Sequence, residues 1–409
     1  MLVAFLVTML VYPHVLNFAR KHNIVDNPNA RKLQRVPVPV MGGTTVFIGL
    51  LVAGNIGYFF APDSRMIVIL VLLFVMYLIG TLDDVKDVSV SVRFLIELLV
   101  VWMMILLLGV EINDLHGLWG IHRIPDAVSV PLSLIAGVGI MNAINLIDGV
   151  DGYCSSFGTM ACLAFAITFY YVGDMPMFML ALITIGALIP FFFHNVFGRS
   201  SKMFLGDGGS LMLGTLLTLF VFNTLSVDSP CSAYGDSGLS LPALVLAILA
   251  VPVFDTLRVM IFRVIKGKSP FHPDKTHLHH LFIEMNFSHL ATSAQIVFGN
   301  ILIVAALVVS WILGASINFQ LYLVIALALA FTWGFYFFME AQHRKNDGEG
   351  SALFQRWCNR GRKTSITATG AWRFIRRAVD SRFLGGKRPT TIHRPTIPEP
   401  TDRPDPRIQ

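Results

Sequence analysis

Charged residues are scarce in this chain of 409 residues: Asp, Glu, Lys and Arg together make up 14% of it. An ordinary soluble domain has about 25%. Hydrophobic residues account for 55% of the chain, and Phe alone occurs 32 times. So little charge excludes an ordinary soluble domain and predicts a protein that exposes much of its surface to lipid.

Cysteine is also scarce. The four cysteines, Cys154, Cys162, Cys231 and Cys358, have no metal-binding or redox spacing, so we expect them to pack as small apolar side chains. The sequence also lacks an internal repeat of roughly 20–50 residues. It contains no matching pair of interrupted apolar segments, and this absence argues against an inverted-repeat transporter.

Long apolar runs fill the first 340 residues. Each has roughly 17–25 residues, enough to cross ~30 Å of hydrocarbon as a helix. We identify eleven, at about residues 1–18, 42–60, 66–82, 94–110, 127–144, 154–172, 176–193, 209–225, 240–262, 292–314 and 319–339. The first has no cleavage site and no basic leader, so we expect a retained helix. The predicted fold is an all-α polytopic membrane protein with about 11 transmembrane helices.

The distribution of basic residues predicts the orientation. With eleven spans, 29 of the 31 Lys and Arg residues fall on one side, and only Arg65 and Arg123 fall on the other. Cytoplasmic loops carry the excess of Lys and Arg in membrane proteins. The N-terminus is therefore predicted outside and the C-terminus in the cytoplasm. The net charge of +6 follows from this bias and requires no nucleic-acid partner.

The composition changes near residue 341, which predicts a transmembrane domain at 1–340 and a basic cytoplasmic tail at 341–409. Within the tail, aromatic and Arg residues alternate over 372–384. This pattern indicates either a short amphipathic helix on anionic lipid or a merely solubilising tail. The final stretch, 388–409, contains several prolines and should be disordered.

Four polar clusters interrupt the apolar sequence, all on the predicted cytoplasmic side. The first holds Asp83, Asp84 and Asp87 at the end of an apolar run. Adjacent carboxylates near a low-dielectric boundary repel one another unless a cation compensates them. Mg²⁺ prefers carboxylate oxygen and often bridges to substrate phosphates. The alternative interpretation is a solvated helix end with Lys86 as its counter-charge.

The second cluster repeats a polar residue every three positions, at Asn142, Asn145, Asp148 and Asp151. Steps of three keep these side chains near one stripe of a helix. Amides and carboxylates on one stripe need partners, because an unpaired polar group near hydrocarbon costs several kcal/mol. We interpret the stripe as a binding surface; a structural hydrogen-bond ladder between helices is the alternative.

The third and fourth clusters add a Gly-rich turn and a histidine loop. Asp207 lies in the turn at 204–210, which could also offer backbone N–H groups to phosphate. His277, His279 and His280 lie in a loop beside basic segments. Histidine can donate to phosphate or bind a metal, and we favour phosphate contact. An exposed polar loop is the alternative.

Two further groups carry charge. Arg31 and Lys32 form a cationic patch in the first cytoplasmic loop, suited to a lipid phosphate or explained by ordinary positive-inside charge. Asp255 lies inside an apolar run, where an ionisable residue is functional or paired. Arg258, three residues later, is its expected partner.

These motifs carry a resemblance to a known family. DDVKD at 83–87, NAINLIDGVDG at 142–152, FLGDGGS at 204–210 and SPFHPDKTHLHH at 269–280 resemble, in this order, the polyprenyl-phosphate N-acetylhexosamine-1-phosphate transferases. The resemblance covers about residues 10–340. The histidine loop is more similar to the GlcNAc-1-phosphate branch than to the muramoyl-pentapeptide branch. Gln34 stands where members often have His, and Tyr153 where Leu is common.

The resemblance implies an enzyme of the bacterial inner membrane with its active site on the cytoplasmic face. UDP-HexNAc and undecaprenyl phosphate would give UMP and undecaprenyl-diphospho-HexNAc, which initiates cell-envelope polysaccharide synthesis such as that of lipopolysaccharide. Mg²⁺ would be the cofactor, with Mn²⁺ as the alternative ion. Membrane lipids would surround the protein, and a second copy of the chain is the one protein partner considered.

Residue roles follow from the same resemblance, motif by motif. Asp83 and Asp84 would be the catalytic acidic pair, and Asn145 and Asp207 the metal-associated residues. Substrate-binding residues would be Asn142, Asp148, Asp151, His277, His279, His280, Arg31 and Lys32.

The expected reaction is a phosphoryl transfer that depends on positioning and charge neutralisation. A lipid phosphate monoester has a second pKa near ~6, so it is mostly a dianion at neutral pH and needs little help from a base. Direct displacement is therefore favoured over an aspartyl-phosphate intermediate at Asp83 or Asp84.

The rival class of function is an ion-coupled secondary transporter, whose sites usually lie near the bilayer midplane. A scaffold presenting the tail is a third class, and deleting the tail should abolish a scaffold but largely spare a transferase.

Overall fold

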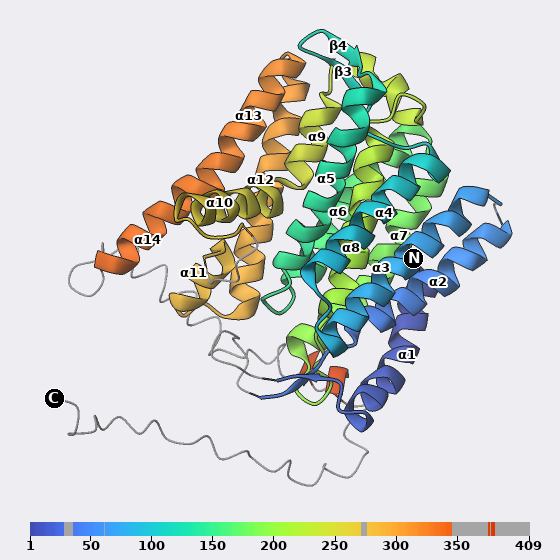
Figure 1. The fold of residues 1–409 in the computed structure, drawn as a ribbon, viewed down its shortest axis with the longest axis vertical. Coiled ribbons are helices and arrows are strands. Elements are labelled where there is room, and N and C mark those ends of the chain that lie inside the picture. Colours follow the sequence, from blue (N-terminus) through green and yellow to red (C-terminus); the bar gives the residue numbers. More distant parts are fainter. Residues whose placement is uncertain (28–35, 61, 271–275, 346–374, 377, 381–409) are drawn as a thin grey trace.

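The protein is a bundle of apolar helices (Figure 1). The computed structural model describes residues 1–27, 36–60, 62–270, 276–345, 375–376 and 378–380. The helices are α1 (Leu2–Lys21), α2 (Gly42–Phe60), α3 (Ser64–Lys86), α4 (Val90–Met103), α5 (Asp126–Leu146), α6 (Tyr153–Val172), α7 (Met175–Phe197), α8 (Gly206–Thr224), α9 (Leu241–Ile248), α10 (Ala250–Ile265), α11 (Leu278–Glu284), α12 (His289–Ile312), α13 (Ile317–Leu329) and α14 (Phe335–Lys345). Single π-helical turns extend α4 and join α13 to α14, at Met104–Leu108 and Ala330–Gly334.

Strands are few and short. β1 (Val25–Asp26) pairs with β2 (Val38–Pro39), and β3 (Asp114–Leu118) pairs with β4 (Ile121–Arg123), both antiparallel. The two pairs lie at opposite ends of the bundle (Figure 1). The strands are connections between helices, so the all-α prediction holds for the described residues.

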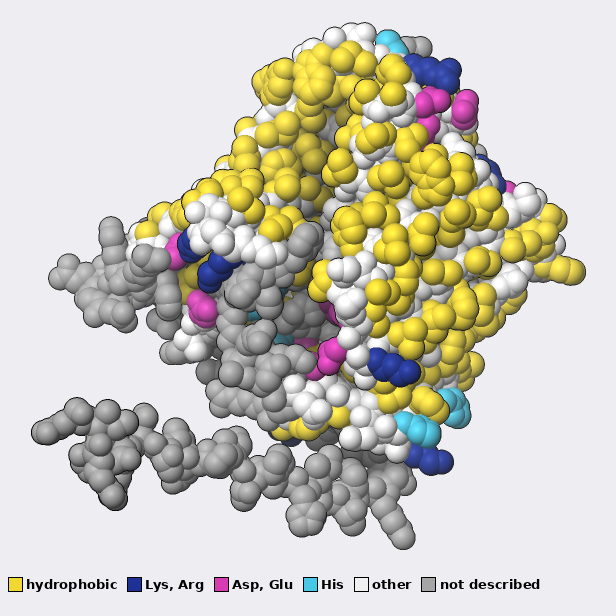
Figure 2. All heavy atoms as spheres, viewed as in Figure 1, with side chains coloured by type: hydrophobic (Ala, Val, Ile, Leu, Met, Phe, Trp, Pro, Cys, Tyr) yellow, Lys and Arg dark blue, Asp and Glu magenta, His cyan; other side chains and the backbone are white. Residues whose placement is uncertain are grey.

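Nine helices in the described part of the chain are long and apolar enough to span a membrane, or ten if α9 and α10 count as one bent span. Eleven were predicted, and α8 accounts for the remaining difference. Its 19 residues have the length of a span, but Asp207, Gly and Thr residues make it less apolar. On the face that Figure 2 shows, apolar side chains cover most of the bundle, and this is the surface expected of a protein embedded in lipid.

Helix α8 lies at the centre of the bundle, where every residue except Asp207 is buried. It packs mainly against α3 and α5. Contact with α3 is close because both helices carry glycine there: a Cβ at Gly80 would overlap the carbonyl of Asp207, and one at Gly208 would overlap the hydroxyl of Thr81. This close packing places the end of α3, with its two aspartates, beside the start of α8.

The run predicted as one span at 240–262 is two helices that meet at an angle of 73°. Pro252 lies in the first turn of α10, where it cannot donate to the preceding helix. The Asn300 amide, on α12, donates to the carbonyls of Ala247 and Ile248 and accepts from the N–H of Val251. These bonds satisfy the backbone that the bend exposes, as a lipid environment requires.

After the bend, α10 runs across the neighbouring helices (Figure 1). It carries Asp255 and Arg258 toward α11 and the loop before it, so Asp255 belongs to this transverse helix and not to the middle of a straight span. The expected pairing of these two residues is confirmed, with 2.7 Å between Arg258 Nη2 and Asp255 Oδ1.

Only a small part of the basic tail is described. Residues 375–376 and 378–380 are helical, and Asp380 is buried against the loop after α7. Most of the predicted amphipathic segment, and all of 388–409, lie outside the described residues.

Candidate active site

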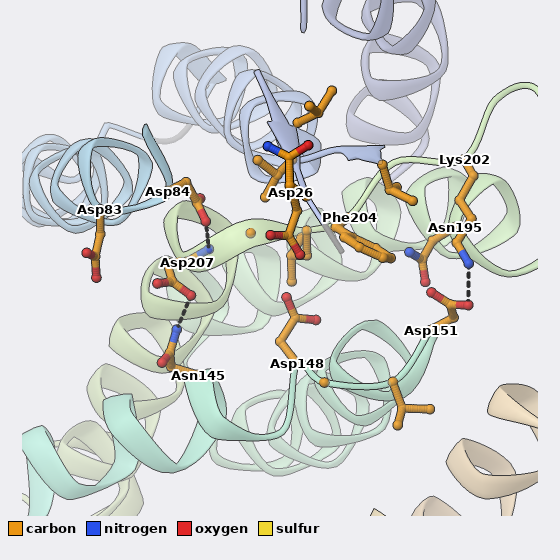
Figure 3. Close-up of a pocket in the computed structure, with 18 of the residues that line it drawn as sticks. Asp26, Asp83, Asp84, Asn145, Asp148, Asp151, Asn195, Lys202, Phe204 and Asp207 are labelled. Atoms are coloured by element: carbon orange, nitrogen blue, oxygen red, sulfur yellow. Dashed lines mark hydrogen bonds and ion pairs between the residues drawn. The ribbon is translucent and has the colours of Figure 1, made fainter. Parts of the chain in front are cut away.

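A pocket of about 1000 Å³ opens at the end of the bundle where α3 and α5 finish and α8 begins. Its lining comes from β1 and β2, the end of α3, residues 145–151, residues 202–207, and two histidines, His280 and His289. Three of the four predicted clusters place carboxylates here (Figure 3). Six aspartates from those clusters line the pocket: Asp83, Asp84, Asp87, Asp148, Asp151 and Asp207.

The two adjacent aspartates at the end of α3 make different contacts. Asp84 accepts hydrogen bonds from the N–H groups of Asp207 (3.1 Å) and Gly208 (3.3 Å), at the start of α8. An anion is stabilised there by the unpaired N–H groups and by the helix dipole. Asp83 accepts from the N–H of Val88 (2.8 Å) and from Arg93 Nη1 (2.9 Å). Both carboxylates are therefore held in place by donors on each side.

Asn145 and Asp207 are in direct contact. The Asn145 amide Nδ2 donates to Asp207 Oδ1 (2.8 Å) and to the hydroxyl of Ser210 (3.0 Å). The carboxyl of Asp207 also lies within hydrogen-bonding reach of Asp83. In this arrangement Asn145 orients Asp207, while Asp207 presents a carboxylate to the pocket.

Arg93 and Glu97 form a network that the sequence analysis missed. Arg93 lies 2.9 Å from Asp83, 3.9 Å from Asp207 and 3.6 Å from Glu97. The side chain of Glu97 is buried and accepts from the Asn142 amide at 2.5 Å. Their spacing of four residues on an apolar helix was the available signal, because charges within a span are usually paired or functional.

This network gives Asn142 a place different from the predicted one. Its amide donates to Glu97 and to the carbonyl of Val138, and Asn142 is not among the residues that line the pocket. A direct contact between Asn142 and substrate thus stays a prediction. The structure shows a hydrogen bond between helices at Asn142, which is the alternative interpretation given for this polar stripe.

Asp148 and Asp151 lie on the same loop but in opposite electrostatic surroundings. Burial, then the negative charges of Asp207 and Asp84, raise the pKa of Asp148 well above its usual range. Burial would also raise the pKa of Asp151, but His289 and Lys202 outweigh it and hold that pKa below its usual range. Asp151 Oδ2 lies 2.5 Å from Lys202 Nζ and 3.0 Å from His289 Nδ1.

The donor set suits a hard cation. Asp83, Asp84, Asp148 and Asp207 bring four carboxyl groups to one side of the pocket, and Arg93 is the one described cation that contacts any of them. Among the described residues, no three His, Cys, Asp or Glu side chains form a ready-made metal site. Mg²⁺ does not require one, since it is commonly held by one or two carboxylates together with substrate phosphates and water.

The three predicted histidines do not share one role. His277 is 3% exposed, and its Nδ1 lies 2.9 Å from Asp255 Oδ2. His279 is buried against Gly149, where a Cβ would lie 2.7 Å from its Nε2. Burial, then the neighbouring His280 and His277, lower the pKa of His279 well below its usual range. Of the three, His280 lines the pocket; phosphate contact by this loop stays a prediction.

Several lining residues were missed, among them Lys202, which contacts Asp151, as well as Asp26 and His289. Asp26, at the end of β1, points into the pocket opposite Asp148 (Figure 3). His289 begins α12 and binds both the side chain and the backbone N–H of Asp151. Neither lies in a cluster, so the sequence held no local signal for them. Arg31 and Lys32 lie outside the described residues.

Comparisons with known proteins agree with this geometry. A model of the family described as glycosyl transferase family 4 matches residues 66–224, from α3 through α8. A protein of Bacillus subtilis (strain 168), named probable undecaprenyl-phosphate N-acetylglucosaminyl 1-phosphate transferase, is 32% identical over 289 residues, covering 70% of this chain and 77% of the relative.

Two further relatives are both named undecaprenyl-phosphate alpha-N-acetylglucosaminyl 1-phosphate transferase. That of Escherichia coli O157:H7 is 30% identical, covering 69% of this chain and 76% of the relative. That of Yersinia pestis is 31% identical, covering 66% and 72%. The chain therefore belongs to glycosyl transferase family 4.

Proposed function

We propose that the chain transfers HexNAc-1-phosphate, specifically GlcNAc-1-phosphate, from a UDP-sugar to undecaprenyl phosphate, giving undecaprenyl-diphospho-HexNAc and UMP. The observation that carries the proposal is the meeting of Asp83, Asp84, Asp148 and Asp207 in one pocket at one end of an apolar bundle. Such a site meets a water-soluble nucleotide and a membrane lipid at once. The names of the relatives supply the sugar and the lipid.

The proposed setting is the bacterial inner membrane, with the pocket on the cytoplasmic face, the N-terminus outside and the tail inside. Arg20, Lys86 and Lys202 lie at the pocket end of their helices or loops, while Arg65 and Arg123 lie at the opposite end. This distribution follows the positive-inside rule.

The proposed chemistry is attack by the lipid phosphate on the sugar-bearing phosphorus, with UMP as the leaving group. Asp207 and Asp83, oriented by Asn145 and Arg93, would hold Mg²⁺, which when bound neutralises charge on the diphosphate. Lys202 has three donors, of which Asp151 takes one, so it can also contact a phosphate oxygen. His280 faces the same space.

The contacts of the acidic pair favour one displacement step over two. Both oxygens of Asp83 accept hydrogen bonds, from Val88 and Arg93, and both oxygens of Asp84 accept backbone N–H groups. Carboxylates held in this way are weaker nucleophiles than free ones, since the hydrogen bonds stabilise the negative charge on their oxygens. The lipid phosphate, mostly a dianion at neutral pH, can attack without a covalent aspartyl intermediate.

The transporter alternative fits the structure less well. Transporter sites lie near the midplane, at paired broken helices, whereas the carboxylates here lie at helix ends. One bent pair occurs in the described part, and its acidic residue, Asp255, is already paired with Arg258 and His277.

A donor panel tests the proposal. The purified full chain would be incubated with undecaprenyl phosphate, Mg²⁺ and radiolabelled UDP-GlcNAc, UDP-GalNAc or UDP-MurNAc-pentapeptide. We expect labelled lipid and stoichiometric UMP with UDP-GlcNAc, loss of both in EDTA, and recovery on adding Mg²⁺. Asp207→Asn should be inactive and Asp126→Asn, at the opposite end of the bundle, active. Lack of transfer from every donor would refute the proposal.

A further inference from the structure

A carboxylate from the C-terminal tail is buried beside the active-site loop. Asp380 is 7% exposed. Its oxygens accept from the N–H of Arg199 (3.2 Å), the N–H of Ser201 (3.2 Å) and the hydroxyl of Ser201 (3.0 Å). One turn earlier, Arg376 Nε donates to the carbonyl of Phe197, at the end of α7. This part of the tail lies outside the region that the family model matches.

The loop of residues 198–201 is held from two sides. The carbonyl groups of the loop accept hydrogen bonds from α1: the Tyr12 hydroxyl donates to Ser201 O at 2.8 Å, and Arg20 donates to Ser200 O. The N–H groups of the loop donate hydrogen bonds to Asp380. A buried carboxylate is costly unless donors surround it, and charge-assisted bonds of this kind are among the stronger ones. Asp380 therefore stabilises one backbone arrangement of the loop.

The next residue belongs to the pocket. Lys202 Nζ lies 2.5 Å from Asp151 Oδ2 and 5.5 Å from the ring centre of Phe204. A long Lys side chain has many rotamers, so its head is placed well only if its backbone is fixed. Asn195 fixes the far side of the loop, donating to Met203 O and accepting from Gly152 N. Asp380 and α1 fix the near side of the loop.

We propose that Asp380 is a positioning residue: by docking residues 375–376 and 378–380 on the loop after α7, it holds Lys202 against Asp151 in the pocket proposed to bind the UDP-sugar. The inference rests on the proposed function. It also changes the expectation for the tail, because removing the segment should weaken donor binding even though none of the tail residues that the structure describes lines the pocket.

Point variants of the full chain test the inference. Asp380→Ala should raise the KM for the UDP-sugar about tenfold, equivalent to about 1.4 kcal/mol, with kcat within about twofold of the wild type. The KM of Asp380→Asn, which keeps one acceptor oxygen, should lie between that of the wild type and that of Asp380→Ala. Asp402→Asn removes a carboxylate elsewhere in the tail and should change nothing. If Asp380 acts through Lys202, then Lys202→Met and the double variant should have equal KM values; additive effects would overturn the inference.

Hydrogen exchange provides a readout independent of turnover. In the Asp380→Ala protein, the amides of residues 199 and 201 should exchange faster, while peptides of α9 should not change. Unchanged exchange at 199–201, or an unchanged KM, would overturn the inference while leaving the proposed function intact. A wild-type protein without transferase activity would refute the proposed function, whatever the exchange data show.

Discussion

Arg93 lies among three carboxylates, those of Asp83, Glu97 and Asp207. An arginine so placed lowers the repulsion within the acidic group and fixes the direction of Asp83. Its planar guanidinium suits this role better than a Lys head, because its donors point in several fixed directions. Arg93 therefore belongs to the structure of the site, as its spacing of four residues from Glu97 on an apolar helix could have indicated.

We expect Arg93→Met to lower the free energy of unfolding by about 1–3 kcal/mol, because Asp83 and the buried Glu97 lose their counter-charge. Arg93 is 19% exposed, so solvent moderates the loss. The matched control is Arg65→Met, which breaks the ion pair with Asp63 where Arg65 is 42% exposed; exposed pairs contribute about 0–1 kcal/mol. Thermal unfolding in detergent measures both. Equal shifts for the two variants would contradict the role assigned to Arg93.

The buried His279 predicts a pH dependence of stability. Its pKa in the folded protein is below its usual value of about 6.5, mainly through burial. Below that usual value the unfolded chain binds a proton that the folded protein does not, so stability falls as the pH drops. The slope for one proton is about 1.4 kcal/mol per pH unit.

His279 should therefore lower the unfolding temperature between about pH 6.5 and pH 5, whereas Asp148, whose pKa is raised, acts in the opposite direction in both the wild type and the variant below. In His279→Asn, which cannot titrate, the decrease should be smaller. The lowered pKa of Asp151 contributes nothing in this range: its stabilisation is present above its usual pKa near 4 and is lost at lower pH. Parallel curves for the two proteins would show that His279 is not the titrating group.

The contact between α3 and α8 depends on the absence of side chains. Gly80 and Gly208 let the two backbones meet, and Asp84 then reaches the N–H groups at the start of α8. The bend between α9 and α10 is a second local feature that positions helices, and Asn300 satisfies the backbone groups that this bend exposes. In both cases one small or polar residue allows two helices to place charged groups at the pocket end.

Gly80→Ala should separate α3 from α8 and reduce transferase activity by about tenfold or more, since small displacements of catalytic groups are costly. Gly57→Ala in α2 is the control, because a Cβ there meets nothing within 4 Å. That change should preserve activity and stabilise the helix by about 0.5–1 kcal/mol. Activity of the two variants, measured with equal amounts of folded protein, tests the prediction. A fully active Gly80→Ala protein would contradict it.

The molecule as a whole separates most of its described basic residues by end: Arg20, Lys86 and Lys202 lie at the pocket end, and Arg65 and Arg123 at the other. The β3–β4 end also holds Trp119, whose indole donates to Tyr322. Aromatic residues of this kind favour the membrane interface. The separation supports one orientation in the membrane.

Cysteine labelling should reveal that orientation. Asp126→Cys, at the β3–β4 end, should react with a membrane-impermeant maleimide in spheroplasts, and Lys86→Cys, at the pocket end, only in inverted vesicles. Cys154, Cys162 and Cys231 are buried, and Cys358 would be replaced by Ser in both variants. Labelling of Lys86→Cys in spheroplasts would reverse the orientation.

Much of the site could be predicted from the sequence because it lies in short, local motifs. Asp83, Asp84, Asn145, Asp148, Asp151 and Asp207 all lie at the pocket. Arg93 and Asp26 lie outside the motifs. The motifs also could not predict Glu97, His289 or Asp380, since the partners of these residues lie 45 to 181 positions away in the chain. The bend of α9 and α10 was missed for the same reason: an apolar run of sufficient length looks like a straight span, and Asn300 lies on another helix.

Hydropathy and charge bias depend only on composition along the chain, so the sequence by itself determined the helical membrane class, the polar clusters and the resemblance to a family. Which polar groups meet depends on contacts between residues far apart in the chain, such as Asp380 with Arg199, 181 positions away. Only the tertiary structure decided that His277 is bound to Asp255 and that the Asn142 amide donates to Glu97. The same holds for the support that the Asp380 carboxylate gives to Lys202. Packing creates these pairs because buried polar groups must find partners wherever the fold places them.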